Sequence, residues 1–195
     1  MKRAYDICTS TLLIVLVSAL SFHVAAAEFA PISLVPTRVV IAERGALTGF
    51  LLMTASNTVS FLPPDRWKVD KKSRQVVIAA PDLSATLTLQ VFDNLWRTNG
   101  WNWAAVRHDL CTRNPQSHLV REIDCYASDA AGKAYDIEQK AANDAKLITR
   151  TAVVPFQSGI AEITLTTVKS RFADQTYVFG TFMSSLRFAS LSANR

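Results

Sequence analysis

The stretch SATLTLQVF, Ser84–Phe92, decides the fold, because apolar and polar side chains alternate along it from Ser84 to Val91. Its alanine, valine and two leucine side chains fall on one side of an extended chain, and its threonine and glutamine side chains fall on the other. This period of two predicts a strand with one buried face and one face in contact with water. A sheet built from such strands needs a second layer to cover its apolar face.

Further segments with the composition of strands lie on both sides of this one. They are Val59–Leu62, Trp67–Val69, Gln75–Ala79, His118–Tyr126, Lys133–Lys140, Lys146–Val154 and Ile160–Lys169. The last four are separated by short connections rich in turn residues, at Asp129–Gly132, Asn143–Asp144 and Pro155–Gly159. Short turns of this kind favour antiparallel neighbours, so these four segments are predicted to form a meander.

Two segments change to a helical period. Apolar residues recur at spacings of three and four within Asn94–Asn114, where Asn99 or Asn102 is the candidate N-cap and Pro115 ends the helix. Large apolar side chains also follow one side of Arg171–Arg187. The order of elements predicts an α+β fold in a single domain: a mostly antiparallel β-sheet covered by two amphipathic helices.

The first 27 residues have the three parts of a secretory signal peptide. Lys2 and Arg3 precede the apolar run Thr11–Leu20, and the small residues Ala25–Ala27 precede Glu28. Polar residues interrupt the stretch before it reaches the roughly 20 apolar residues of a membrane span. We expect cleavage after Ala27 and a soluble product, periplasmic or secreted, with no stable insertion into the membrane.

The remainder is long enough for one domain with its own core. We expect residues 28–58 to form an N-terminal arm or extra element, residues 59–189 the domain, and residues 190–195 a tail. The apolar pieces Val39–Ile41 and Phe50–Met53 leave a strand, a short helix and a partly mobile arm open for the first of these. The formal net charge of +5 is mild and scattered, and with export it argues against a nucleic-acid partner.

Three stretches together resemble a known family. The extended entry FLPPDRW (Phe61–Trp67), the strand Ser84–Phe92 and the segment GIAEITLTT (Gly159–Thr167) leading into Phe172–Phe188 resemble the PsbP/Mog-like superfamily, whose exported bacterial branch includes DcrB-like proteins. The resemblance spans about residues 59–189 and implies an α/β/α sandwich. It also implies an accessory or binding protein, but it matches no functional motif residue by residue and so implies no site.

Cys111 and Cys125 are the two cysteines of the expected mature chain. In an oxidising compartment an isolated pair usually forms a disulfide, and we predict this bridge. The predicted helix and strand place the two residues at different heights, so the bridge requires the helix to end early or the strand to start late.

Trp96, Trp101 and Trp103 crowd one short segment before the predicted helix. Large aromatic side chains at such a junction either pack onto the core or serve as anchors for a protein partner. Core packing is the simpler interpretation, and the three residues are the candidate partner-binding residues of this sequence.

Two polar groupings are candidates for a metal site and for a catalytic pair. A period of two puts His118, Glu122 and Asp124 on one side of a strand, but neighbours on that side are about 7 Å apart, so a wet sheet face explains them better than a metal site. The side chains of His108 and Asp109 point about 100° apart on a helix, so they do not face each other as a catalytic base and its orienting partner would. No nucleophile elbow, dinucleotide fingerprint or P-loop is present in the sequence, so we predict no catalytic, cofactor-binding or metal-binding residues.

The sequence therefore favours an exported accessory or scaffold protein that binds another envelope protein, whose identity the sequence does not indicate, and performs no catalysis. A binder of a small apolar ligand, held in a cleft between a helix and the sheet and lined by phenylalanine and tryptophan, is the alternative. An enzyme of unrecognised type is less favoured.

The cleavage prediction is tested on protein recovered after export. N-terminal sequencing is expected to begin at Glu28, because Ala25–Ala27 supplies the small residues that a signal peptidase requires. A product that begins at Met1 and sediments with lipid vesicles would contradict it.

Overall fold

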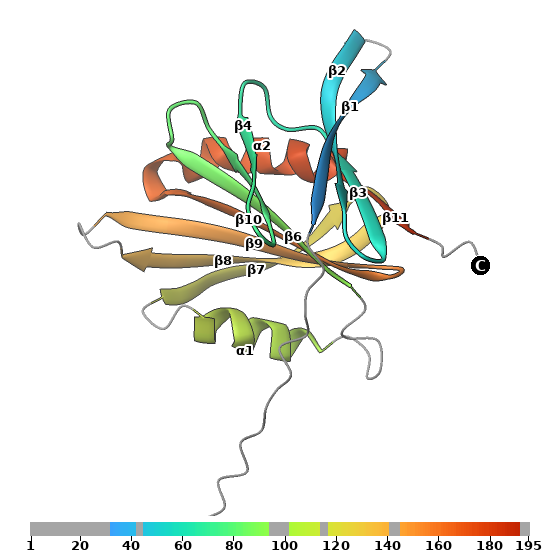
Figure 1. The fold of residues 1–195 in the computed structure, drawn as a ribbon. Coiled ribbons are helices and arrows are strands. Elements are labelled where there is room, and N and C mark those ends of the chain that lie inside the picture. Colours follow the sequence, from blue (N-terminus) through green and yellow to red (C-terminus); the bar gives the residue numbers. More distant parts are fainter. Residues whose placement is uncertain (1–31, 42–44, 94–101, 114–116, 141–144, 192–195) are drawn as a thin grey trace, which may run out of the picture.

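The computed structural model describes residues 32–41, 45–93, 102–113, 117–140 and 145–191. Within these ranges the chain forms two antiparallel β-sheets and two α-helices, which confirms the predicted α+β class (Figure 1). The predicted signal peptide, residues 1–27, lies outside the described residues. In the described part, neither helix has the length and apolar character needed to cross a membrane.

The strands are β1 (Ser33–Ile41), β2 (Gly45–Met53), β3 (Asn57–Phe61), β4 (Lys68–Lys71), β5 (Val76–Ala79), β6 (Ala85–Asp93), β7 (Ser117–Ala127), β8 (Ala130–Lys140), β9 (Lys146–Phe156), β10 (Gly159–Val168) and β11 (Arg187–Ser190). The helices are α1 (Trp103–Arg113) and α2 (Phe172–Ser185), and a 3-10 turn, Lys169–Arg171, leads into α2.

The larger sheet has the strand order β4-β5-β6-β10-β9-β8-β7. Its second half is the predicted meander of four consecutive antiparallel strands. Strand β6 pairs with β10 along nine residues and shows the predicted alternation: Ala85, Leu87 and Leu89 are buried, and the residues between them are half-exposed. The period of two was therefore sufficient to predict the centre of the sheet.

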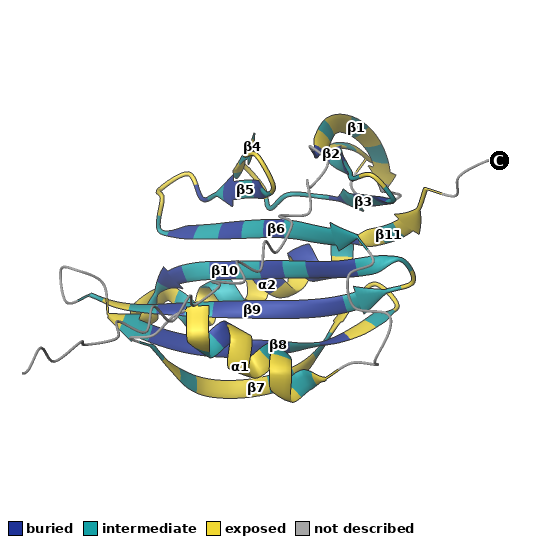
Figure 2. Cartoon of the chain, turned by 60° about the horizontal axis from the view of Figure 1, so that its bottom comes forward, coloured by how far each residue is buried: buried dark blue, intermediate teal, exposed yellow. Residues whose placement is uncertain are grey.

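Each helix covers a different face of the larger sheet (Figures 1 and 2). Helix α2 buries Phe179, Phe182 and Met183 in the main core, with apolar side chains of β5, β6 and β10. Helix α1 buries Leu110 in a smaller cluster, mainly on β8 and β9, on the other face. Its start is capped as predicted, because Asn102 Oδ1 accepts a hydrogen bond from the Ala105 N–H at 3.1 Å.

The smaller sheet has the strand order β1-β2-β3-β11. Described residues 32–53 enter it as the β1–β2 hairpin. Of the strand, the short helix and the partly mobile arm that the sequence allows here, the structure has strands. Strand β11 is not predicted by the sequence, which places Arg187 at the end of the second helix, Ser190 in the tail and no element between them. It pairs with β3 from Arg187 opposite Ser60 to Ser190 opposite Asn57, and so returns the chain to its first strands.

Four polar residues join the two sheets, and we call them the polar junction: Thr54, Asn57, Asp93 and Ser158. Asn57 is completely buried. Its Nδ2 donates to Asp93 Oδ1 and, at 3.2 Å, to the Ser158 carbonyl, while the Ser158 hydroxyl donates to Asn57 Oδ1. Thr54 Oγ1 donates to the same Asp93 oxygen at 2.6 Å. The junction thus links the β2–β3 turn to the end of β6 and to the β9–β10 turn.

Gly132 was predicted in a turn and lies instead inside β8. A Cβ atom at this position would overlap the carbonyl oxygen of Val153 on β9, so the close approach of the two strands requires glycine. The turn is formed earlier, where Ser128 adopts a left-handed φ of 57°. The glycine signal was therefore assigned to the wrong backbone feature.

A charged cluster is buried on the α2 side of the sheet. Asp136 of β8 accepts hydrogen bonds from Arg150 of β9 at 2.6 and 2.8 Å, and both residues are almost fully buried. Arg121 of β7 donates to the same carboxylate at 2.9 and 3.0 Å. The Arg150 guanidinium also lies 5.0 Å from the centre of the Phe172 ring. Each buried charge is therefore compensated.

Replacing Asp136 by asparagine leaves Arg150 buried without its counter-charge. We expect Asp136→Asn to lower the free energy of unfolding by about 3 kcal/mol, measured by urea titration. The matched control is Asp124→Asn, since that carboxylate is 76% exposed and its pairing with Lys133 contributes about 1 kcal/mol or less. Equal losses for the two variants would contradict the compensation argument.

Candidate functional site

A groove of about 560 Å³ lies between β2, the loop after β3, β4 and α2. We call it the β2–α2 groove. Its lining residues are Leu47, Thr48, Phe50, Leu62, Pro63, Pro64, Asp65, Arg66, Trp67, Val69, Tyr177, Val178, Thr181, Phe182 and Ser185. The mixture of aliphatic and aromatic side chains with a few hydroxyls is the usual composition of a binding site.

The loop that forms one wall of the groove is held in place by local interactions. The Leu62 N–H donates to Ser185 Oγ near the end of α2 at 3.1 Å. A turn follows, in which the Trp67 N–H donates to the Pro64 carbonyl at 3.1 Å. Arg66 within this turn has a left-handed φ of 62°. The wall is therefore attached to the helix that forms the opposite side of the groove.

Aromatic side chains support the floor of the groove. The rings of Phe50 and Phe61 stack at 5.7 Å between centroids, and Phe61 meets Phe182 of α2 edge to face at 5.6 Å. Such contacts fix ring positions in addition to burying apolar area. Tyr177, one turn earlier on α2, is 81% exposed at the rim. The groove thus combines a rigid apolar floor with an accessible aromatic side chain.

The arrangement is suited to binding. Ser185 Oγ is already engaged, since it lies within hydrogen-bonding distance of the Leu62 and Phe182 carbonyls as well as the Leu62 N–H. Among the described residues, no group of three or more His, Cys, Asp or Glu side chains is placed to hold a metal ion. What the groove offers a ligand is apolar contact area, the hydroxyls of Thr48 and Thr181, and the charges of Asp65 and Arg66.

Of the three tryptophans predicted as partner-binding residues, the structure places one. Trp103 begins α1 and is half-buried against the cluster beneath that helix, in agreement with the simpler interpretation of core packing. Trp96 and Trp101 lie outside the described residues. A partner surface at these tryptophans stays a prediction.

The predicted disulfide between Cys111 and Cys125 is not formed: both residues are free cysteines. Cys125 of β7 packs against the main core on the α2 side of the sheet. Cys111 belongs to α1, which packs on the other face. The sheet therefore separates the two thiols, and this corrects the pairing inferred from the compartment.

A β-bulge separates the side chains that were considered as a metal site. The pairing of β7 with β8 shifts between Leu119 and Arg121, so His118 lies opposite Glu138 whereas Glu122 lies opposite Tyr135. Tyr135 and Glu138 are three residues apart on β8 and point to opposite faces. The imidazole is thus on the other face from Glu122 and Asp124, and Lys133 bridges these two carboxylates at 2.8 and 3.3 Å.

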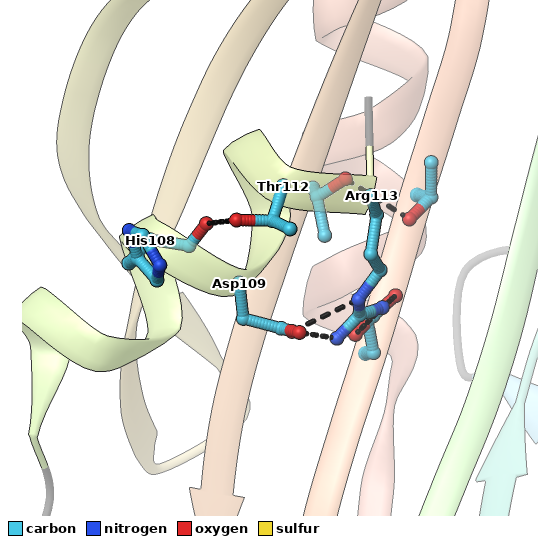
Figure 3. A network of polar contacts seen from close by, with 7 residues as sticks. His108, Asp109, Thr112 and Arg113 are labelled. Atoms are coloured by element: carbon cyan, nitrogen blue, oxygen red, sulfur yellow. Dashed lines mark hydrogen bonds and ion pairs between the residues drawn. The ribbon is translucent and has the colours of Figure 1, made fainter. Parts of the chain in front are cut away.

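His108 and Asp109 do not form a catalytic pair. Figure 3 shows the Asp109 carboxylate pointing toward the guanidinium of Arg113, one turn later on α1, and away from the His108 ring. Arg113 also donates to both carboxylate oxygens of Glu162 on β10 at 3.1 Å. The ion pair between Arg113 and Glu162 connects α1 to the sheet. The hydrogen bonds with Asp109 raise the pKa of Arg113.

Sequence reasoning did not identify the β2–α2 groove as a site. From the sequence, the FLPPDRW segment, Phe61–Trp67, is interpreted as a turn between two strand segments and as part of the family resemblance, and not as a binding surface. Tyr177 gave no signal, because one exposed aromatic residue on a helix is common. The contribution of β2 could not be predicted, because the sequence does not decide the secondary structure of residues 28–58.

Comparison with solved structures identifies the fold. Cyanobacterial PsbP (CyanoP) from Synechocystis sp. PCC 6803 matches with a TM-score of 0.52 and 13% sequence identity, over 84% of this chain and 96% of that chain. The chain has a PsbP-like fold. This confirms the family resemblance seen in the sequence as a resemblance of fold, and identity this low shows the fold alone.

Two other structures match less well. The Saccharomyces cerevisiae Ran-binding protein Mog1p has a TM-score of 0.47 and 8% identity, over 80% of this chain and 96% of that chain. Mycobacterium tuberculosis LpqN, which is involved in cell envelope biogenesis, has a TM-score of 0.45 and 12% identity, over 81% and 91%. No protein-family model matches the sequence, and a search of curated proteins finds no match.

The thiols of this PsbP-like chain allow a direct test of the placement of Cys125 against the main core. Burial, with a contribution from the neighbouring Asp124, raises the pKa of Cys125 to about 11. In a Cys111→Ser variant at pH 8, labelling by a thiolate-specific reagent should be slow, because only about 0.1% of the Cys125 thiol is ionised. The rate should rise about tenfold for each pH unit up to pH 10.

The control is the unreduced mature protein, with both cysteines, in denaturant. Unfolding removes the burial, so two thiols per chain should react rapidly. The absence of reactive thiols in this sample would show that a bridge forms and would contradict the structure.

Proposed function

We propose that this protein is an exported, non-catalytic accessory protein that binds another protein of the envelope through the β2–α2 groove. The observation that carries the proposal is the exposed ring of Tyr177 beside a rigid apolar floor. Exposed tyrosines next to desolvated pockets are characteristic of the residues that dominate protein interfaces. The predicted leader supplies the argument for export.

The groove explains how a modest surface can bind a partner. Tyr177 presents a large contact area at a small cost in side-chain entropy, and a partner side chain entering the groove would lose much of its water. The exposed pair Asp65 and Arg66 gives the rim a polar character, which is the usual arrangement around an apolar interface centre. The energy of such an interface comes mainly from the anchors, and the rim contributes specificity.

The fold is compatible with this role. One helix on each side of the larger sheet supports the description of the domain as an α/β/α sandwich. The likeness to CyanoP concerns the fold, and one fold serves many functions. The engagement of Asp109 by Arg113 supports a non-catalytic role, because it removes the orienting partner that a base at His108 would need.

A second candidate function is the binding of a small apolar ligand in the same groove. Its volume of about 560 Å³ falls within the range of small-molecule sites, and Phe50, Trp67 and Phe182 are among its lining residues. Native mass spectrometry of freshly purified mature protein distinguishes the two. A retained small ligand would favour this candidate.

The main proposal is tested by photo-crosslinking in the native host. A benzoyl-phenylalanine at position 177 should give a discrete protein adduct, because this side chain lies at the rim of the proposed interface. The matched control is position 126, since Tyr126 is 65% exposed but lies on β7, adjacent to Cys125 and pointing to the other side of the sheet.

A substitution in the groove separates a specific adduct from accidental labelling. Thr181→Arg places a long charged side chain in the groove and should abolish the adduct formed from position 177. The proposal is wrong if position 177 gives no adduct, or if positions 177 and 126 give the same adducts.

A further inference from the structure

The edge of strand β2 points to the form in which a partner enters the β2–α2 groove. We propose that the occupant is an extended segment of the partner protein, which adds to the free edge of β2 as a strand. This inference rests on the proposed function and specifies the mode of binding at the same site.

Strand β2 has unequal neighbours on its two sides. On one side β1 pairs with all nine of its residues, from Gly45 to Met53. On the other side β3 pairs with Phe50–Met53 only. In the part of the chain that the structure describes, no strand pairs with Gly45–Gly49 on this second side. The groove lies on this side, since Leu47 and Thr48 line it together with the loop that follows β3.

The sequence of the loop explains why the edge is free. Phe61 is the last residue of β3 opposite β2, and Pro63 and Pro64 follow, which have no N–H to donate to a strand. The N–H of the intervening Leu62 is directed to Ser185 of α2. The two strands are still close at Gly49, where a Cβ atom would lie 3.1 Å from the Phe61 carbonyl oxygen. Beyond this point they diverge, and the groove opens between them.

A strand edge beside an apolar groove selects an extended polypeptide. Unpaired backbone N–H and C=O groups are matched by the backbone of another strand, and alternate side chains of that strand then enter the groove. The backbone N–H and C=O groups of a helix are already paired within the helix, and an apolar small molecule has no such groups. Neither could therefore pair with the edge of β2. Residues Gly45–Gly49 offer an edge about 17 Å long, which suits a segment of about five residues.

The added strand would also complete an incomplete sheet. From Gly49 back to Gly45, β2 pairs with β1 alone among the described strands, and Val40 on β1, opposite Ala46, is largely exposed. An isolated two-stranded ribbon is marginally stable in water, whereas a third strand with an apolar face stabilises it. Binding would therefore stabilise the hairpin at Gly45–Gly49.

The charge beside the groove specifies the occupant further. Residues 65–74 contain five basic side chains and two acidic ones. Arg66 lines the groove and Lys68 follows on β4; both side chains are more than three-quarters exposed, and their pairs with Asp65 and Asp70 are weak surface ion pairs. The surplus of positive charge favours a segment that carries aspartate or glutamate next to its apolar residues.

The probes are peptides selected against the mature protein from a random dodecapeptide library displayed on phage. We expect selected sequences with alternating apolar residues and at least one acidic residue. On binding, the backbone amides of Ala46–Thr48 that point away from β1 should become protected from hydrogen exchange, because they form new inter-strand hydrogen bonds. The amides at the outer edge of β1 serve as the internal control and should not change.

N-methylated versions of the selected peptide test the backbone pairing. Alternate N–H groups of an added strand point toward β2 and away from it. Methylation of the residues whose N–H groups point toward β2 should weaken binding by about tenfold or more, whereas methylation of the residues between them should be tolerated. Lys68→Glu should weaken binding by about threefold and make it less dependent on salt. The matched control is Lys146→Glu, at an exposed lysine of β9 remote from the groove.

Each result has a defined meaning. Peptides that lose affinity on Tyr177→Ala, yet neither protect Ala46–Thr48 nor respond to N-methylation, overturn strand addition and leave the groove as the proposed site. Failure to select any groove-binding peptide, protection at β1 instead of β2, or pairing of the β2 edges of two copies in a concentration-dependent dimer also overturns it. Photo-crosslinking at position 177 judges the proposed function separately.

Discussion

Asn57 has no exposed surface, and its side chain connects three turns and strand ends that are distant in the sequence. This polar junction attaches the smaller sheet to the larger one, together with Leu52, Val59 and Phe61, which lie in the main core. A buried amide that lost these partners would carry the full cost of desolvation, so arrangements of the two sheets that keep these hydrogen bonds are favoured. The arrangement of the sheets determines where the β1–β2 hairpin lies relative to α2, and the β2–α2 groove is the space between them.

The rest of the fold supplies a rigid frame around this junction. In the larger sheet, Asp136 and Arg150 are paired inside the structure, and a change of register would separate them. Helix α2 contributes Phe182 both to the main core and to the floor of the groove. The frame is therefore shared between stability and binding, whereas Tyr177 at the rim contributes to binding without being needed for the core.

The fold class was predictable because it depends on patterns with a physical period. The alternation in Ser84–Phe92 and the turns between the later strands were enough to predict the sheet and its meander. Features set by one local irregularity were not predictable. The bulge near Val120 moved His118 to the other face, and Gly132 served close strand packing where a turn had been expected. The disulfide was inferred from the compartment and allowed only with a shift of the helix or strand ends, and the sheet separates the two cysteines.

The candidate site was not predictable, because it is assembled from segments that have no common sequence signal. Its walls come from β2, from a proline-rich loop and from a helix more than 100 residues later, and only tertiary structure brings them together. The proline pair was visible in the sequence, but its consequence, a free length of β2, depends on the pairing of β2 with β3. A strand edge can be recognised only after the order of the strands is known.

The account depends on the polar junction holding the smaller sheet in place, and native-state hydrogen exchange of an Asn57→Ala variant tests this most directly. The account predicts that amides in Gly45–Phe61 exchange at least about tenfold faster than in the unmodified protein, while those of β8 to β10 keep their protection. Unchanged protection in Gly45–Phe61, or an equal loss throughout the described sheets, would contradict it.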